Sequence, residues 1–552
     1  MTPRATTLLR PVACALALAS ALFAQLPAPY VPPQNPQTPA KVVLGKILFW
    51  DEQLSSDDTV ACGTCHLPEF GGSDGRPAGG LHPGADNLFG TADDVHGSAG
   101  VVRQAPNGDF AFSSLFGLER QATGRTSQTT LGAAHHLELF WDGRAPSQFV
   151  DPETGAVIIP FGGALESQAV GPILNPVEMG RPGRTWQHVR QKLQAAIPLR
   201  LASNLPPDVA AALQQHPTYP SLFTAAFGDP AISAARIGMA LASYQRTLNP
   251  DDTPWDRYMA GQVSAMTAAE KAGWQLFQNQ GRCAACHWAP LFSDDLFHNL
   301  GLRFVAEDVG RGQFTPYVED QGAFKTPTLR NAGLRPRLFH NGQSPGLGDP
   351  TQWTDPNSSL LVYWNGSGVD PSNLDPFMLP LNQLGVTQAE VALIQDFVRT
   401  ALTDQRAALR LPPFDHPDLR SAVVAPPRVF GAALPGQFAP RFLDAMPTFP
   451  GNADYRLGLA AGGSTIGLVA WGFQSIEPNA FVGALPWHLH VAGWDLFSLT
   501  AAPGRPGLAT WRLPLPADPS LATVPLYFQL FALDNAAAGG IASSRGWEFF
   551  VR

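Results

Sequence analysis

Two short motifs of cysteine and histidine constrain the fold of this chain more than any other feature of its sequence. The segments Cys62-Gly63-Thr64-Cys65-His66 and Cys283-Ala284-Ala285-Cys286-His287 share the pattern C-x-x-C-H. Such a motif joins a haem covalently to a chain, because the two thiols add to its vinyl groups and the histidine binds its iron. The sequence therefore predicts two covalent c-type haems. The predicted attachment residues are Cys62, Cys65 and His66 for the first haem and Cys283, Cys286 and His287 for the second.

Other cysteine chemistry explains the two motifs less well. A disulfide or a thioredoxin-type redox pair needs two cysteines but not the histidine that follows them. A structural zinc site needs four ligands at closer spacing than these distant motifs offer. Covalent haem attachment is the interpretation that uses all three residues of each motif.

The N-terminus has the pattern of an export signal. Arg4 and Arg10 precede an apolar run over residues 12–23, and the small residues Ala21 and Ala24 suit cleavage. We expect a signal peptide over residues 1–24 and a periplasmic or secreted mature protein. The run is too short to span a bilayer, so the mature protein is not expected to be membrane-spanning.

Composition excludes one class of partner and predicts several domains. The 552 residues carry a net charge of −9 and no basic block, so no nucleic-acid partner is expected. Capping boxes at Thr267 and Thr387 start helices with apolar stripes, such as Trp274 and Phe277. After Leu411, short apolar runs between Gly, Pro and Asn turns predict an antiparallel β-sandwich.

These patterns predict a multidomain protein with two mainly α-helical cytochrome-c-like haem domains, followed by an all-β sandwich-like domain. The expected bounds are 1–24 for the signal peptide, 25–245 for the N-terminal haem domain, 246–410 for the C-terminal haem domain and 411–552 for the β-sandwich accessory domain.

Ordered sequence blocks surround the two motifs. They are Leu44-Gly45-Lys46-Ile47-Leu48-Phe49, Phe140-Trp141-Asp142-Gly143-Arg144, Gln168 with Asn175-Pro176-Val177-Glu178-Met179-Gly180, Phe297-His298-Asn299-Leu300-Gly301, Phe324-Lys325-Thr326-Pro327-Thr328-Leu329-Arg330-Asn331 and Phe339-His340-Asn341-Gly342. With these blocks, residues 40–405 resemble the bacterial di-haem cytochrome c peroxidase family, which includes the enzyme that matures methylamine dehydrogenase. The tail beyond Leu411 is not covered by the resemblance.

The resemblance implies a role for each site. The haem held by His66 would bind peroxide, and the haem held by His287 would receive electrons from an outside donor. Glu178 matches the catalytic acid–base of the family, and Gln168 matches its partner. Peroxide must lose a proton from one oxygen and gain one on the other, and a single carboxyl group can do both. Trp141 matches the tryptophan that relays electrons between the haems.

The chain departs from the family pattern at the first iron. Many members cap this iron with a histidine, but Leu118 stands near that position. His82 follows His66 by 16 residues, which fits a capping histidine, but it lies in a Gly- and Pro-rich insert over residues 78–100, so a loop histidine is favoured. We therefore expect an open first iron that reacts with peroxide without prior reduction.

The second iron and a calcium site also depart from the pattern. Trp364 stands where the family has Tyr, and an indole nitrogen does not bind iron. The neighbouring Tyr363 is the candidate sixth ligand, with Met378 as a weaker alternative. Calcium between the haems remains open, because Thr126 replaces the Asn of the family, and backbone carbonyls near Arg335 and Arg337 would complete the site.

The resemblance implies a peroxidase that reduces hydrogen peroxide to water. Its electrons would come from a small periplasmic donor protein, a cytochrome c or a cupredoxin; a homodimer remains open. One alternative is a haem-dependent oxidase that modifies a protein or a small molecule. Another is a non-catalytic electron-transfer cytochrome, but such a carrier has no need of Glu178 and Gln168.

Overall fold

The computed structural model describes most of the chain. The described residues are 26–76, 80–423, 428–430, 433–434, 437–443, 446–448, 452–461, 466–482, 485–490, 493–502, 505–518, 520–521, 524–537, 539 and 541–550. The expected signal peptide, residues 1–24, lies outside them. Within the described part, no helix is long and apolar enough to cross a membrane.

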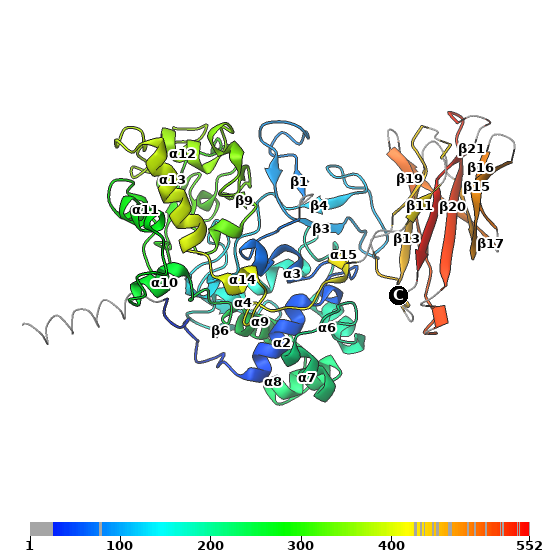
Figure 1. Cartoon of the computed structure of the whole chain (residues 1–552). Helices are drawn as coiled ribbons and strands as arrows, with labels where there is room; N and C mark the ends of the chain where they lie inside the picture. Colours follow the sequence, from blue (N-terminus) through cyan, green and yellow to red (C-terminus); the bar gives the residue numbers. More distant parts are fainter. Residues whose placement is uncertain are drawn as a thin grey trace, which may run out of the picture.

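The first module, residues 26–245, combines helices with short paired strands (Figure 1). Its helices are α2 (Pro39–Trp50), α3 (Cys62–Cys65), α4 (Ala164–Ala169), α5 (Gly171–Leu174), α6 (Trp186–Ala195), α7 (Pro207–Gln215), α8 (Tyr219–Phe227) and α9 (Ala234–Gln245). Its antiparallel strand pairs are β1 (Leu81–His82) with β2 (Val95–His96), β3 (Ala99–Val102) with β4 (Arg120–Ala122) and β5 (Phe149–Val150) with β6 (Val157–Ile159).

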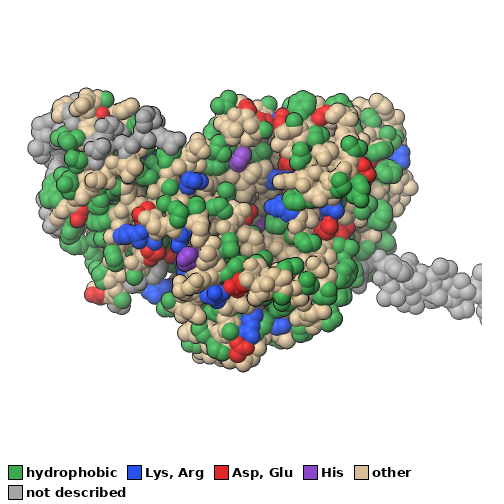
Figure 2. Space-filling model, turned by 180° about the vertical axis from the view of Figure 1, so that it is seen from behind, with side chains coloured by type: hydrophobic (Ala, Val, Ile, Leu, Met, Phe, Trp, Pro, Cys, Tyr) green, Lys and Arg blue, Asp and Glu red, His purple; other side chains and the backbone are tan. Residues whose placement is uncertain are grey.

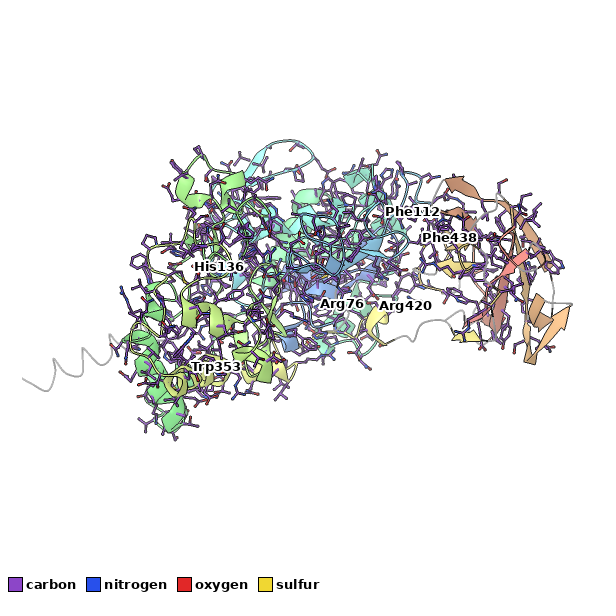
Figure 3. All side chains as sticks on the ribbon, turned by 90° about the horizontal axis from the view of Figure 1, so that it is seen from above. Arg76, Phe112, His136, Trp353, Arg420 and Phe438 are labelled. Atoms are coloured by element: carbon purple, nitrogen blue, oxygen red, sulfur yellow. The ribbon has the colours of Figure 1, made fainter. Side chains whose placement is uncertain are left out.

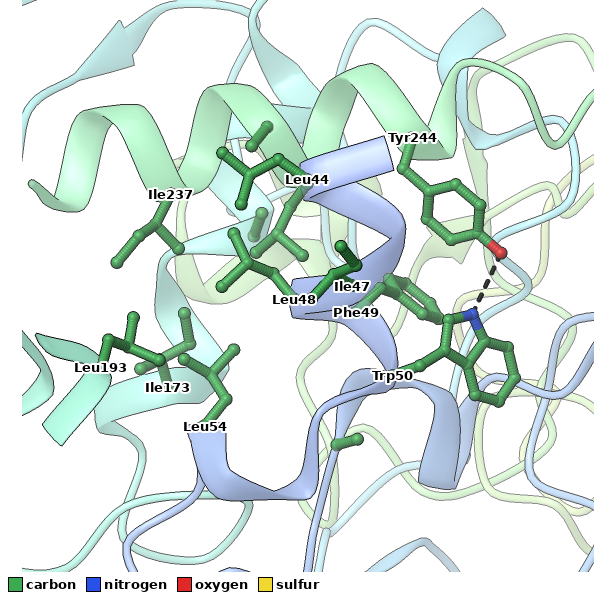
Figure 4. Packing of buried hydrophobic residues seen from close by; sticks show 14 of the residues in the cluster. Leu44, Ile47, Leu48, Phe49, Trp50, Leu54, Ile173, Leu193, Ile237 and Tyr244 are labelled. Atoms are coloured by element: carbon green, nitrogen blue, oxygen red, sulfur yellow. Dashed lines mark hydrogen bonds between the residues drawn. The ribbon is translucent and has the colours of Figure 1, made fainter. Parts of the chain in front are cut away.

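Helices α2 and α9 form the centre of the first module. Thr38 caps α2 by accepting from the N–H of Lys41, which starts the helix just before its apolar residues. Gly45 allows close packing, because a Cβ there would lie 1.9 Å from the carbonyl oxygen of Ala240 in α9. At the end of α2, the indole N–H of Trp50 donates to the hydroxyl of Tyr244 over 3.1 Å (Figure 4). This fixed helix pair supports the turn that carries the first motif.

The second module, residues 246–410, has its own helices and two short strand pairs. Its helices are α10 (Pro254–Met259), α11 (Ala268–Gln278), a 310 turn (Cys283–Ala285), α12 (Ser359–Asn365), α13 (Gln388–Asp396) with a following π-helical turn (Phe397–Ala401), and α14 (Gln405–Ala408). Strand β7 (Phe297–His298) pairs with β8 (Phe324–Lys325), and β9 (Arg337–Leu338) pairs with β10 (Ser344–Pro345).

The capping boxes predicted for this module are confirmed. Thr267 accepts from the N–H of Glu270 at the start of α11, and Thr387 caps α13 in the same way. Trp274 and Phe277 on α11 are buried, with ring centroids 5.8 Å apart. They form an aromatic core beneath the second motif.

Ion pairs join the two modules. Arg125 of the first module lies 2.6 Å from a carboxylate oxygen of Asp308, and Arg311 of the second module lies 2.6 Å from Glu138. These side chains are partly buried, so the pairs are less screened by solvent than surface pairs. They hold the two motif-bearing modules together.

The segment that begins with the last helix of the second module, residues 405–423, packs against the first module. We call it the return segment; it contains α14 and α15 (Arg420–Val423). Phe414 and Leu419 are buried in the core of the first module. His416 stacks on the indole of Trp50, with ring centroids 3.9 Å apart. The Pro-rich stretch from Leu411 is therefore well packed.

The C-terminal β region, residues 428–550, contains two larger sheets and a hairpin. One sheet has the order β11 (Arg428–Phe430), β22 (Gly546–Phe550), β20 (Pro525–Leu533), β14 (Ile466–Gly472) and β17 (Gly493–Ser498), with β21 (Ile541–Ser543) also pairing β20. The other has the order β12 (Arg441–Leu443), β13 (Arg456–Ala461), β19 (Arg505–Arg512) and β18 (Thr500–Ala502), and β15 (Gln474–Val482) pairs with β16 (Leu485–His490).

Both larger sheets contribute to one buried core. Leu457 and Leu459 of β13 pack in the same cluster as Val469 of β14 and Leu530 of β20. In the space-filling view, the β region forms a lobe beside the motif-bearing modules (Figure 2). The predicted combination of mainly helical modules with a C-terminal β region is confirmed.

Candidate functional site

The first motif holds its histidine in one fixed orientation. The Nδ1 atom of His66 lies 3.1 Å from the carbonyl oxygen of Gly72, which can only accept, so Nδ1 carries the proton and Nε2 stays available to a ligand. Burial lowers the pKa of His66, which favours the neutral imidazole that iron requires. Gly63 packs directly against the indole ring of Trp50, because a Cβ at this position would come within 2.3 Å of the ring. The turn is therefore packed tightly onto the end of α2.

The second motif repeats this arrangement on a different backbone. The Nδ1 atom of His287 lies 2.9 Å from the carbonyl oxygen of Phe292, which again leaves Nε2 for a ligand. Burial raises the pKa of Cys62, Cys65 and Cys283 to about 12, which keeps these thiols neutral. The four motif cysteines form no disulfide. Two thiols and one imidazole at each cavity fit a covalently attached haem.

The first cavity has a volume of about 550 Å³ and is lined by the first motif. Gln168 on α4 and Glu178 in the loop after α5 also line it. Asn175 shapes this loop, because its side-chain oxygen accepts from the N–H groups of Val177 and Glu178 over 2.9 and 3.4 Å. The structure therefore brings the two predicted catalytic residues into the cavity of His66.

The charge environment of Glu178 suits proton exchange. Burial raises the pKa of its carboxyl group, and the positive charge of Arg144 lowers it again. No side chain in the described part of the chain hydrogen-bonds to this carboxyl group. Arg144 lines the same cavity, lies over the ring of Phe140 and donates to Asp142 over 2.8 Å. Arg144 belongs to one of the sequence blocks around the motifs, but no local signal in the sequence places it near Glu178.

Trp141 lines both the first and the second cavity. Its indole N–H donates to the carbonyl oxygen of Thr126 over 2.8 Å, which fixes the ring between the two sites. The ring also meets His340 edge to face, with centroids 6.4 Å apart, and His340 stacks on Phe324 at 3.5 Å. The tryptophan predicted to lie between the haems is thus placed where the two cavities adjoin.

The second cavity is smaller, about 250 Å³, and is lined by the second motif. Tyr363 and Met378, the two candidate sixth ligands, both line it. Trp364 is not in the lining and packs edge to face on Trp353, with centroids 5.6 Å apart. Burial raises the pKa of Tyr363, which keeps its hydroxyl protonated in the absence of a cation.

One group of side chains beside the second motif has metal-like spacing. Cys286, Asp294 and His298 bring their ligand atoms within 4.8 Å of one another. A cysteine joined to haem by a thioether bond has no thiolate to offer a second metal. Burial disfavours the charged form of His298, but its contacts with the carboxylates of Asp294 and Asp375 raise its pKa. This group is therefore better described as an imidazolium held between two carboxylates.

His82 was interpreted as a loop histidine, but the structure places it in the lining of the first cavity. It belongs to β1, which pairs with β2 inside the Gly- and Pro-rich insert. Its Nδ1 atom is buried without a hydrogen-bond partner in the described part of the chain. Leu118, the position near which the family carries a capping histidine, is buried against Leu443 and Ala460 of the β region. His82 is therefore the histidine that needs testing as an iron ligand.

The side chain expected to bind calcium between the haems, Thr126, is engaged in another contact. The hydroxyl of Thr126 donates to the carbonyl oxygen of His96 over 2.6 Å, so its position is already fixed by a hydrogen bond. No carboxylate stands at this position in the sequence to supply the charge that calcium favours.

Comparisons with known proteins point to one family. The family profile described as di-haem cytochrome c peroxidase matches residues 39–264. The methylamine utilization protein MauG of Methylophilus methylotrophus is 34% identical over 326 residues, covering 58% of this chain and 73% of that protein. The cytochrome c peroxidase Ccp of Escherichia coli (strain K12) is 30% identical over 361 residues, covering 64% of this chain and 60% of that protein.

A solved structure is also similar. It is described as a MauG-like protein associated with microbial copper homeostasis, and the match covers 71% of this chain and 97% of that one, with a TM-score of 0.48 and 23% identity. The sequence matches confirm the resemblance found in the blocks around the two C-x-x-C-H motifs. The chain belongs to the di-haem cytochrome c peroxidase family.

Proposed function

We propose that this di-haem oxidoreductase reduces hydrogen peroxide to water in the first cavity, with electrons that enter at the second. The observation that carries the proposal is the placement of Glu178 and Gln168 in the cavity of His66. Trp141 adjoins both cavities, which supports its role as the relay between them. An electron carrier needs no acid–base group beside its iron, so the second cavity alone would suffice for that function.

The reaction needs two electrons and two protons for each peroxide. The haem iron supplies the redox chemistry when bound. Glu178 accepts the proton of the inner peroxide oxygen and returns it to the outer oxygen as the O–O bond breaks. Gln168 orients the peroxide by hydrogen bonding, and the charge of Arg144 limits how far burial raises the pKa of Glu178. Two protons from solvent, taken up with the two electrons, complete the second water molecule.

The remaining regions have roles that follow from this scheme. Cys62, Cys65 and His66 would attach the peroxide-reducing haem. Cys283, Cys286 and His287 would attach the electron-receiving haem, with Tyr363 as its sixth ligand.

The haem domains would span residues 25–245 and 246–410, and the two larger sheets would form a β-sandwich. The N-terminal pattern supports export to the periplasm or beyond, where a cytochrome c or a cupredoxin would donate electrons.

The proposal is tested by the stoichiometry of the reaction. The purified full-length protein is mixed with a reduced small cytochrome c and limiting hydrogen peroxide. We expect two donor molecules to be oxidised for each peroxide consumed. Glu178→Gln serves as the control, because it should retain both haems and lose most of this activity.

The two alternative functions give different results in the same experiment. An electron-transfer cytochrome would exchange electrons with the donor but consume no peroxide. An oxidase would consume peroxide with little oxidation of the donor and would turn over when an organic substrate is added. Either result would contradict the proposal.

A further inference from the structure

The C-terminal β region packs against a hairpin of the first module. This hairpin consists of β3, β4 and the chain between them, residues 99–122. Side chains alternate along β13 and β19. Leu457 and Leu459 of β13 and Trp511 of β19 point into the core of the β region, so the residues next to them along each strand face outward. The outward residues of this sheet meet the hairpin. The outward set is Arg441, Leu443, Arg456, Gly458, Ala460, Leu508, Thr510 and Arg512.

The centre of this contact is apolar. Leu118 of the hairpin is 3% exposed and packs with Leu443 and Ala460, which are 9% and 1% exposed. Phe112 of the hairpin and Leu508 pack against the same cluster. Figure 3 labels Phe112 at the junction between the first module and the β region. Burial of this kind stabilises a contact far more than surface polar groups do.

Charged groups of opposite sign surround the apolar centre. Arg512 lies 2.7 Å from Asp109, and Arg441 lies 2.7 Å from Glu119. The N–H of Phe110 donates to the hydroxyl of Thr510 over 2.9 Å. The arginines are on the β region and the carboxylates are on the hairpin. This complementarity sets one orientation of the β region against the hairpin.

The other end of the hairpin lies against the loop that carries Glu178. The N–H of Val101 donates to the carbonyl oxygen of Val177 over 3.2 Å, and the side chain of Gln121 donates to the carbonyl oxygen of Pro176 over 2.7 Å. At Gly100, a Cβ would lie 2.8 Å from the Cα of Glu178. The backbone of the hairpin therefore contacts the backbone of the loop at Glu178 directly.

A third contact ties the tip of the hairpin to the same loop. Arg181, three residues after Glu178, donates to the carbonyl oxygen of Pro106. The Glu178 loop is thus bonded to both the base and the tip of the hairpin. The opposite side of that tip is covered by the β region.

We propose that the C-terminal β region is a brace: it fixes hairpin 99–122 and so holds Glu178 at its working position in the first cavity. The proposal rests on the peroxidase function proposed above and assigns a role to the region that the family resemblance does not cover. A small displacement of a proton-transferring group lowers a rate strongly, because the reaction requires hydrogen-bond distance to the peroxide. The residues of the contact act through Glu178 as positioning residues.

The test breaks the contact in the full-length, haem-loaded protein. Leu118→Asp places a carboxylate in the apolar centre of the contact, away from the cavity lining. Leu496→Asp is the matched control, because Leu496 is 71% exposed on the other sheet of the β region. Hydrogen–deuterium exchange is followed in peptides covering residues 99–122 and 175–181, and kcat and KM for peroxide are measured in parallel.

We expect Leu118→Asp to reduce amide protection in both peptides and to lower kcat about tenfold. The KM for peroxide and the spectrum of the second haem should stay close to those of the parent. Leu496→Asp should behave as the parent does. If the hairpin peptide loses protection while residues 175–181 and kcat remain parental, the brace is rejected.

A charge reversal gives a second test, should Leu118→Asp fail to accumulate. Arg512→Asp places two carboxylates side by side at the edge of the contact between the β region and the hairpin. Adding Asp109→Arg restores a pair of opposite charges. We expect about a threefold loss of kcat that the double variant recovers. A loss that the double variant does not recover would contradict the proposal.

Glu178→Gln separates this inference from the proposed function. If Glu178→Gln retains the parental rate, the acid–base role fails, whatever the exchange data show. If Glu178→Gln is slow but Leu118→Asp leaves residues 175–181 protected and kcat parental, the function stands and the brace fails.

Discussion

The two motif-bearing cavities of this chain hold their histidines alike and differ in the rest of their lining. Both histidines donate from Nδ1 to a backbone carbonyl, over 3.1 Å at His66 and 2.9 Å at His287. The first cavity is about 550 Å³ and contains Glu178, whereas the second is about 250 Å³ and contains Tyr363. The attachment motif therefore sets where a haem is joined, and the surrounding side chains set its reactivity.

The polar groups near the two sites also differ in whether they can exchange a proton. In the first cavity, burial raises the pKa of Glu178 while Arg144 lowers it, which suits a group that must both accept and give a proton. Beside the second motif, His298 is held between Asp294 and Asp375, at 2.8 and 2.6 Å. That arrangement favours a fixed charge and no proton exchange. This difference supports the proposed peroxide chemistry at the first site and the proposed electron entry at the second.

The largest expected effect comes from removing one attachment thiol at each site. Cys62→Ser should lower the haem content from two to one per chain and abolish the reaction with peroxide. Cys283→Ser should lower the haem content equally but leave a first site that still reacts with peroxide once. Pyridine haemochrome assays and rapid mixing with peroxide measure both quantities. Equal loss of the peroxide reaction in the two variants would contradict the assignment of different roles to the two sites.

A smaller effect is expected from the residue between the sites. Trp141→Phe keeps the aromatic packing but removes the indole N–H and the more easily oxidised ring. Electron passage between the haems should slow by about tenfold or more, which corresponds to roughly 1.4 kcal/mol of barrier. Peroxide binding should remain near the parental level. Stopped-flow absorbance at the two haems separates these steps, and an unchanged transfer rate would exclude Trp141 as the relay.

The pH dependence of the reaction should reveal the influence of Arg144 on Glu178. Glu178 must be ionised to accept the peroxide proton, so kcat/KM is expected to fall as the pH drops through its pKa. Arg144→Gln removes the charge that lowers the pKa of Glu178, so the midpoint of that fall should move to higher pH. Arg144→Lys is the control and should retain most of the parental profile. An unchanged midpoint in Arg144→Gln would show that the two charges do not interact.

The smallest effect is expected at His82. If the first iron is open in the oxidised protein, His82→Ala leaves its high-spin ferric signal unchanged and does not alter reactivity with peroxide. Low-temperature electron paramagnetic resonance measures the spin state of each haem. A low-spin first haem that becomes high-spin in His82→Ala would make His82 the capping ligand and overturn the expectation of an open iron.

Local sequence signals predicted much of this fold. The capping boxes at Thr267 and Thr387 depend on residues three positions apart, and each C-x-x-C-H motif occupies a single turn. The position of Glu178 in the first cavity followed from a sequence block, because the family resemblance carried the tertiary information.

Features that depend on distant contacts were not predicted. His82 reaches the first cavity through the pairing of two strands inside a loop-like insert. Each strand has two residues and is too short to show hydrophobic periodicity in the sequence. Phe414 lies in a Pro-rich stretch typical of linkers, yet it is buried because the return segment packs on the first module. Leu118 is buried only because the β region packs against it. Each of these positions is decided by tertiary packing, which outweighs local pattern.

The most direct test of the central claim is the reaction of Glu178→Gln with peroxide in a stopped-flow instrument. Gln keeps the size and hydrogen bonding of Glu but cannot exchange a proton. We expect kcat/KM for peroxide to fall about 100-fold or more, roughly 2.7 kcal/mol, with both haems attached and the ferric spectrum little changed. Gln168→Ala is the control and should cost less, because it orients peroxide without carrying a proton. A Glu178→Gln protein that reacts at the parental rate would contradict the account and favour an electron-transfer cytochrome.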